Sequence, residues 1–94
     1  MKGYNYNYAF VFYDVGEKRV QKVFKICKKY FIHHQKSVFR GNITPSNLIS
    51  LRKELIKVIN QEEDFITIIK LLGTSAYEEE TIGTNLKDGN SIFI

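Results

Sequence analysis

The stretch Tyr-Ala-Phe-Val-Phe-Tyr-Asp (Tyr8–Asp14) decides the fold, because six apolar or aromatic residues run without a break and stop at a carboxylate. A run this short, rich in Phe, Tyr and Val, indicates a buried β-strand rather than a helix. Tyr4 and Tyr6 alternate with Asn and extend the strand signal towards the N-terminus. A helix start follows, so Asp14 is expected where a central strand ends, a common place for a ligand site or a helix cap.

An amphipathic helix is predicted over Glu17–Tyr30. Apolar residues recur there at three- and four-residue steps: Val20, Val23, Phe24, Cys27 and Tyr30. Lysines recur at the same spacing on the opposite side: Lys18, Lys22, Lys25 and Lys29. Such a row either follows a phosphate backbone or is a solvated face with mutual repulsion. We favour the first interpretation because no Glu alternates with the lysines. Cys27, the one cysteine, is expected in the core.

Four more elements are predicted, in the order strand, helix, strand and edge strand: Phe31–Phe39, Thr44–Asn60, Asp64–Leu72 and Tyr77–Thr84. Arg40-Gly41-Asn42 is expected to end the first of these strands. Thr44 and Pro45 have the residue types of a helix N-cap and first helical position. The chain closes on a short apolar strand, Ser91–Ile94, which needs a sheet edge to pair with.

This order, with a break within the strand regions, predicts an α+β protein of the ferredoxin-like βαββαβ plan, an antiparallel sheet with both helices on one face. Residues 1–84 are expected to form the domain and residues 85–94 a tail strand that contacts a partner. The uncovered sheet face carries aromatic residues, so a face-to-face homodimer is the economical solution.

Charge is distributed unevenly along the 94 residues. Met1–Lys57 carries 12 basic and 3 acidic residues, a net +9, whereas Val58–Ile94 carries 2 and 7, a net −5. A basic half of this strength predicts a polyanionic partner, most commonly nucleic acid. We expect a cytoplasmic protein, because neither a signal peptide nor an apolar run of membrane-spanning length is apparent.

Asp14 is the carboxylate of greatest chemical interest. Asp14-Val15-Gly16-Glu17 has the spacing of a capping box, so one interpretation is a helix cap. The other is a Mg²⁺ ligand, because two copies of Asp14 brought together by a two-fold dimer would share the ion. His33 and His34 are adjacent on a strand, point to opposite faces and cannot share a metal.

The chain resembles the CRISPR-associated protein two family, the small partner of the CRISPR integrase in spacer acquisition. The resemblance covers roughly Tyr8 to Leu72. It rests on Tyr13-Asp14-Val15, Lys18-Arg19, Lys22-Val23, Tyr30 and the string Gln35-Lys36-Ser37-Val38-Phe39-Arg40-Gly41. The chain departs from the family pattern at Phe31, where Gly is usual, His33, where Arg is frequent, and Arg40, where an acid is common.

The resemblance implies a ferredoxin-like homodimer whose final strand pairs with the partner's sheet. It also implies duplex-DNA binding by basic faces, bridging of integrase subunits, and a Mg²⁺-dependent nuclease activity on RNA or DNA. The metal ligand would be Asp14, and Arg19, His33 and Phe39 match positions tied to nuclease activity.

Three functions follow. In the scaffold hypothesis, which we rank first, basic side chains bind DNA phosphates: Lys18, Lys22, Lys25, Lys29, Lys36 and Arg40. In the nuclease hypothesis, paired Asp14 carboxylates hold Mg²⁺. In the third, a non-catalytic RNA-binding module stacks bases on Tyr4, Tyr6 or Tyr8.

Overall fold

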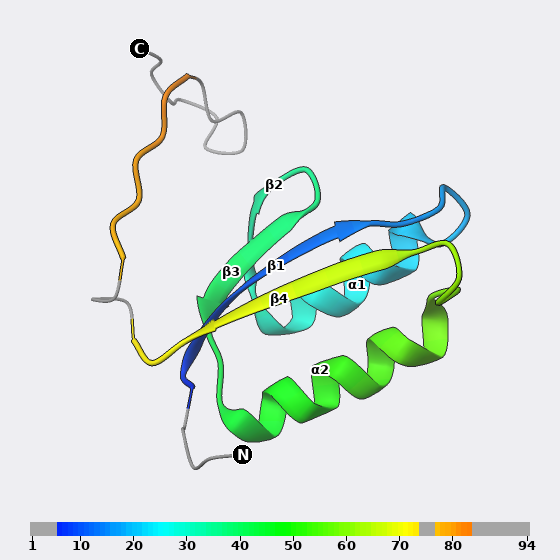
Figure 1. Ribbon diagram of the computed structural model, residues 1–94, viewed down its shortest axis with the longest axis horizontal. Helices are drawn as coiled ribbons and strands as arrows, with labels where there is room; N and C mark the ends of the chain where they lie inside the picture. The colour runs from blue at the N-terminus through cyan, green and yellow to red at the C-terminus, as the bar shows by residue number, and fades with distance from the viewer. Residues whose placement is uncertain (1–5, 74–76, 84–94) are drawn as a thin grey trace.

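Strand β1 (Tyr8–Asp14) lies inside a four-stranded antiparallel sheet of order β2-β3-β1-β4, as the computed structural model of residues 6–73 and 77–83 shows (Figure 1). Its neighbours are β3 (Val38–Asn42) and β4 (Phe65–Leu71), and β2 (Ile32–Gln35) forms the far edge. Helices α1 (Val20–Tyr30) and α2 (Pro45–Val58) cover one face. The predicted ferredoxin-like α+β fold is thereby confirmed.

The core lies between the sheet and the two helices. Residues of β1 alternate, so that Ala9, Val11 and Tyr13 are buried against the helices, whereas Phe12 on the other face is 38% exposed. Helix α1 contributes Val23, Ile26 and Cys27, and α2 contributes Leu48, Leu51 and Leu55. Burial raises the pKa of the Cys27 thiol to about 12, and its predicted core position is confirmed.

Helix α2 begins as its sequence predicts. Thr44 is the N-cap, its Oγ1 accepts a hydrogen bond of 3.0 Å from the amide of Asn47, and Pro45 follows in the first turn. A helix end satisfied in this way needs no long-range partner. Local sequence therefore sets this boundary.

A tight turn divides the strand region predicted over Phe31–Phe39 into β2 and β3, which is the break that the ferredoxin-like plan requires. Lys36 has a positive φ of 35°, and its carbonyl accepts a hydrogen bond from Nε2 of His33 at 2.8 Å. The end of this strand region predicted at Arg40-Gly41-Asn42 is wrong, because β3 runs on to Asn42. Gly41 makes this possible with a φ of 156° and the Phe31 ring packed above it.

Two further expectations concern the C-terminal part. An edge strand over Tyr77–Thr84 is not formed by residues 77–83, which have no regular secondary structure. The expected tail strand, Ser91–Ile94, lies outside the described residues.

Candidate active site and nucleic-acid interface

Asp14 lies at the end of β1, on the sheet face that the helices leave open. Its Cα partner on β4 is Phe65, and its own side chain is exposed. In residues 6–73 and 77–83 its carboxylate makes no hydrogen bond or ion pair. The helix-cap interpretation is wrong, because α1 begins only at Val20, with Arg19 as an N-cap that makes no side-chain capping bond.

The carboxylate that holds the loops around Asp14 together is that of Asp64. The sequence pattern predicts this residue only as the first residue of a strand. Its side chain has no exposed surface. Oδ1 accepts from the Gly16 amide at 2.9 Å and Oδ2 from the Asn60 amide at 2.9 Å. A buried, hydrogen-bonded carboxylate therefore joins the loop after β1 to the loop before β4. An Asp between an acidic turn and an apolar run was the available sequence signal.

Arg19, predicted at a position tied to nuclease activity, is the ionic partner of Asp64. Its Nε donates to Oδ2 at 2.6 Å and its Nη2 to Oδ1 at 3.0 Å, a two-point contact. Nη2 also lies 3.1 Å from the Glu63 carboxylate. The hydrogen bond from Arg19, with those from the two amides, holds the pKa of Asp64 well below its usual range.

His33 and Phe39, the other two residues matched to nuclease positions, lie together on the helix side of the sheet. Their ring centroids are 4.9 Å apart, and the Phe24 ring lies 4.9 Å from His33. Phe39 is fully buried, and Nδ1 of His33 is buried without a partner in the described residues. His34 points to the other face, towards Arg40, which confirms that the two histidines diverge.

The basic residues divide into unpaired and paired side chains. Of the six basic residues predicted to bind phosphate, four are exposed and make no ion pair in the described ranges: Lys18, Lys22, Lys25 and Lys36. Lys18 precedes α1, so its predicted place on the helix is wrong. Lys29 pairs with Glu54, which also accepts from the Tyr30 hydroxyl and thereby joins α1 to α2.

Arg40 and Tyr8 belong to a polar and aromatic cluster on the open face. Nη2 of Arg40 lies 3.1 Å from Glu79, and the Tyr77 ring lies 5.7 Å from that of Tyr8. Tyr8 is 6% exposed. Its proposed role as a stacking platform for RNA bases loses its support, since this ring is covered. Tyr4 lies outside the described residues, and Tyr6 faces the Lys70 ammonium at 5.5 Å.

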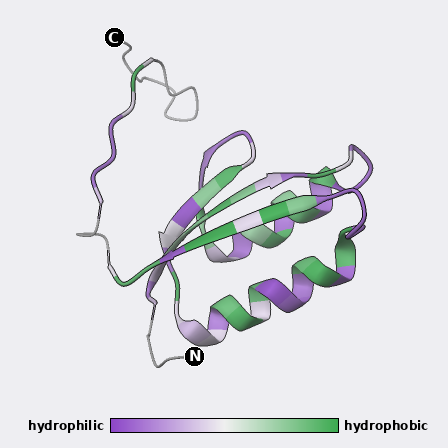
Figure 2. Cartoon of the chain, in the orientation of Figure 1, coloured by the Kyte–Doolittle hydropathy of each residue, from purple (hydrophilic) through white to green (hydrophobic). Residues whose placement is uncertain are grey.

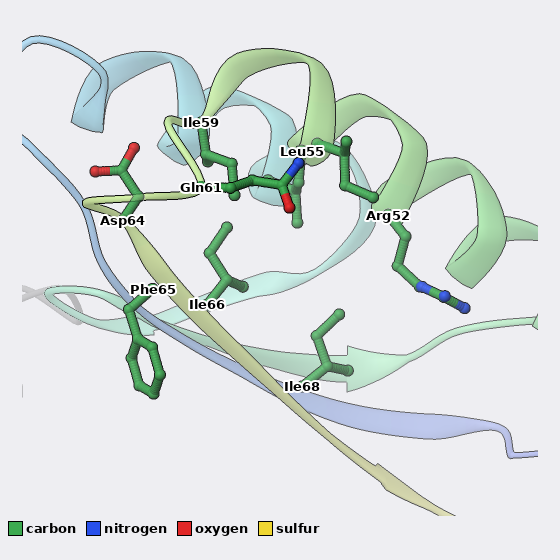
Figure 3. A pocket seen from close by; sticks show the side chains of 9 residues that line it. Arg52, Leu55, Ile59, Gln61, Asp64, Phe65, Ile66 and Ile68 are labelled. Carbon is green, nitrogen blue, oxygen red and sulfur yellow. The ribbon is translucent and has the colours of Figure 1, made fainter.

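A groove of about 280 Å³ runs between α2 and β4, the strand at one edge of the sheet. Figure 3 shows Leu55 and Ile59 of the α2 side above Ile66 and Ile68 of β4. Asp64 closes one end, and Arg52 lies towards the other. The lining is mainly apolar, which suits an extended apolar segment better than an anion.

The described residues contain no cluster of three His, Cys, Asp or Glu side chains able to hold a metal. Within the described residues, Asp14 is therefore a single carboxylate at this end of the open face, and a second copy of the chain would add the second carboxylate that Mg²⁺ commonly takes. Within the same residues no helix is long and apolar enough to cross a membrane.

Comparison with known proteins identifies the family to which the chain belongs. Residues 7–79 match the family model described as CRISPR associated protein Cas2. The chain belongs to the Cas2 family. It is 43% identical over 76 residues to CRISPR-associated endoribonuclease Cas2 3 of Thermodesulfovibrio yellowstonii, covering 81% of this chain and 86% of that protein.

Other Cas2 proteins are similar to this chain over most of its length. The CRISPR-associated endoribonuclease Cas2 of Thermotoga maritima is 33% identical over 86 residues, 92% of this chain and 99% of that protein. A Cas2 crystal structure superposes with a TM-score of 0.77 at 31% identity, covering 83% of this chain and 87% of the other. The Cas2 likeness thus extends to both sequence and fold.

Proposed function

We propose that this Cas2-family protein is a cytoplasmic homodimer of the CRISPR adaptation machinery with two roles. It binds duplex DNA and bridges integrase subunits, and it cleaves RNA or DNA with Mg²⁺ held by Asp14. The observation that carries the nuclease role is an exposed Asp14 without a partner in the described chain, on an open and apolar sheet face.

The proposed dimer forms through that open face. Large apolar side chains are exposed there on three strands: Phe65 (66%) and Ile69 (45%) on β4, Ile32 (69%) on β2 and Phe12 (38%) on β1. Figure 2 shows β1 and β4 coloured largely hydrophobic along their length. Exposed apolar surface on this scale marks an interaction site. The groove beside the β4 edge would receive the partner's apolar tail, Ser91–Ile94.

Two-fold pairing is what gives Asp14 a metal-binding partner. Each protomer would contribute one carboxylate, and Mg²⁺ is commonly held by one or two carboxylates, waters and a substrate phosphate. Bound there, the ion would supply charge stabilisation at the phosphate and an activated water. On the open face, the described residues offer the carboxylate of Asp14 as the ligand.

DNA binding rests on the unpaired lysines Lys18, Lys22, Lys25 and Lys36. Phosphate contacts of this kind make affinity fall steeply with salt. Lys29 and Arg40, already paired with Glu54 and Glu79, would contribute after exchanging those partners.

The test is a cleavage assay with Mg²⁺ on single-stranded RNA and on duplex DNA, comparing the unmodified protein with Asp14→Asn at matched dimer content. We expect cleavage to fall on the order of a hundredfold in Asp14→Asn, with DNA binding retained. Equal cleavage by both proteins would remove Asp14 from the chemistry. Salt-dependent DNA binding without cleavage by either would leave the scaffold role alone.

A further inference from the structure

The contacts of Asp64 lead to an inference about how Asp14 is positioned. Four donors converge on its buried carboxylate: Arg19 Nε at 2.6 Å, Arg19 Nη2 at 3.0 Å, the Gly16 amide at 2.9 Å and the Asn60 amide at 2.9 Å. A carboxylate has about four acceptor positions, so Asp64 has none left for a metal or a substrate. Its role is structural coupling of the segments it joins.

Those segments flank Asp14 on both sides. Asp14 pairs with Phe65, the neighbour of Asp64, and Gly16 lies two residues after Asp14. The Gly16 carbonyl accepts from the amides of Arg19 at 2.9 Å and Val20 at 3.1 Å, which ties the loop to the start of α1. Movement of the loop at Gly16 would therefore change the direction of the Asp14 side chain.

We propose that Arg19, Asp64 and Gly16 form a clamp that positions Asp14, and that Arg19 acts through Asp64 rather than on the nucleic acid. The proposal rests on the metal-binding role proposed above for Asp14. Arg19 is suited to this because its guanidinium is already engaged at two points by a buried carboxylate and at a third by Glu63. A phosphate would have to displace those partners.

Gly16 offers a way to open the clamp without changing any charge. A Cβ at this position would lie 2.5 Å from Nη2 and 3.2 Å from Cζ of Arg19. Gly16→Ala therefore requires the guanidinium to shift from its present position against Asp64, while Arg19 and Asp64 both remain. Glu63→Gln is the matched control, because it alters the exposed contact of Arg19 and leaves the four bonds of Asp64 intact.

The experiment follows the Asp14 carboxyl carbon by NMR in the labelled full chain while MgCl₂ is added. We expect the Mg²⁺ concentration at half the shift to rise about tenfold in Gly16→Ala and Asp64→Asn, the size typical of lost outer-shell contacts. Glu63→Gln should stay within about twofold. Faster hydrogen exchange at the Gly16 amide should accompany the first two variants only.

DNA binding supplies a second measurement. Loss of one phosphate contact lowers the slope of log affinity against log salt by about 0.9. We expect this in Lys22→Gln and an unchanged slope in Arg19→Gln. A lowered slope in Arg19→Gln would place Arg19 on the phosphate and overturn the proposal.

The outcomes separate the clamp from the metal role. Equal Mg²⁺ responses in the unmodified protein and Gly16→Ala would overturn the clamp and leave the metal site standing. No Mg²⁺ response in the unmodified protein would reject the metal site. In that case the clamp is tested by the NMR shift of the Asp14 carboxyl carbon without Mg²⁺. A shift that differs between the unmodified protein and Gly16→Ala supports the clamp, and an equal shift overturns it.

Discussion

At the scale of single residues, the contribution of Asp64 to the stability of the fold depends on its carboxylate being ionised. Its bond from Arg19, aided by the amides of Asn60 and Gly16, holds its pKa well below the ordinary value of 3.8. The unfolded chain takes up a proton near that ordinary value, whereas the folded chain does so only at lower pH. Asp64 therefore stabilises the fold fully above the unfolded pKa, and this contribution is lost as the pH falls towards the folded pKa.

Asp64→Asn should therefore have a pH-dependent effect on the free energy of unfolding. We expect the difference between the unmodified protein and the variant, from urea unfolding, to be largest at neutral pH and to shrink below about pH 4. Asp14→Asn is the control and should change stability little at neutral pH, because its carboxylate makes no hydrogen bond or ion pair with another described residue. A difference for Asp64→Asn that stays constant down to acid pH would contradict the ionic role.

At the scale of elements, α2 shows what local sequence determines. The Thr44 side chain caps the helix through the Asn47 amide at 3.0 Å. Thr44→Ala should lower the free energy of unfolding by about 1 kcal/mol. Ser46→Ala, an exposed change in the same first turn, should cost much less. Equal losses in the two variants, measured by urea unfolding, would show that the cap contributes nothing specific.

Elements set by neighbours in sequence were predictable, and those set by distant contacts were not. The apolar run of β1 and the Thr44-Pro45 start of α2 each carry their own signal. The start of α1 does not, because Arg19 and Asp64, 45 residues apart, order the turn before it. The position of the turn at Lys36 was missed because it depends on a positive φ at a residue other than Gly.

In the candidate site, too, local sequence predicts the position of one residue but not the surroundings of the others. Asp14 at the end of a central strand was predictable from its position after the apolar run. Its neighbours were not, since residues matched by resemblance alone lie in different surroundings. Phe39 is buried beneath the sheet, whereas Arg19 is held by Asp64. Side-chain roles of this kind depend on tertiary packing, which local spacing does not encode.

At the scale of the whole molecule, the sheet has one face covered by helices and one face without a cover in the described chain (Figure 1). The described segment at Tyr77 and Glu79 packs on part of the open face, near Tyr8 and Arg40. The other end, around Asp14 and Phe65, stays exposed. A small domain with such a face gains stability when a second copy covers it.

Ile69→Glu tests that pairing directly. Ile69 lies on β4 opposite Phe10, on the open face, and is 45% exposed. A two-fold interface would bury the new carboxylates without partners, so we expect sedimentation to shift from dimer to monomer and Asp14-dependent cleavage to fall with it.

Ile49→Glu is the matched control, since Ile49 is 53% exposed on α2, away from the sheet's open face. A dimer that survives Ile69→Glu, or dissociates equally with Ile49→Glu, would place the interface elsewhere. Cleavage that persists in a monomeric Ile69→Glu would show that one Asp14 suffices.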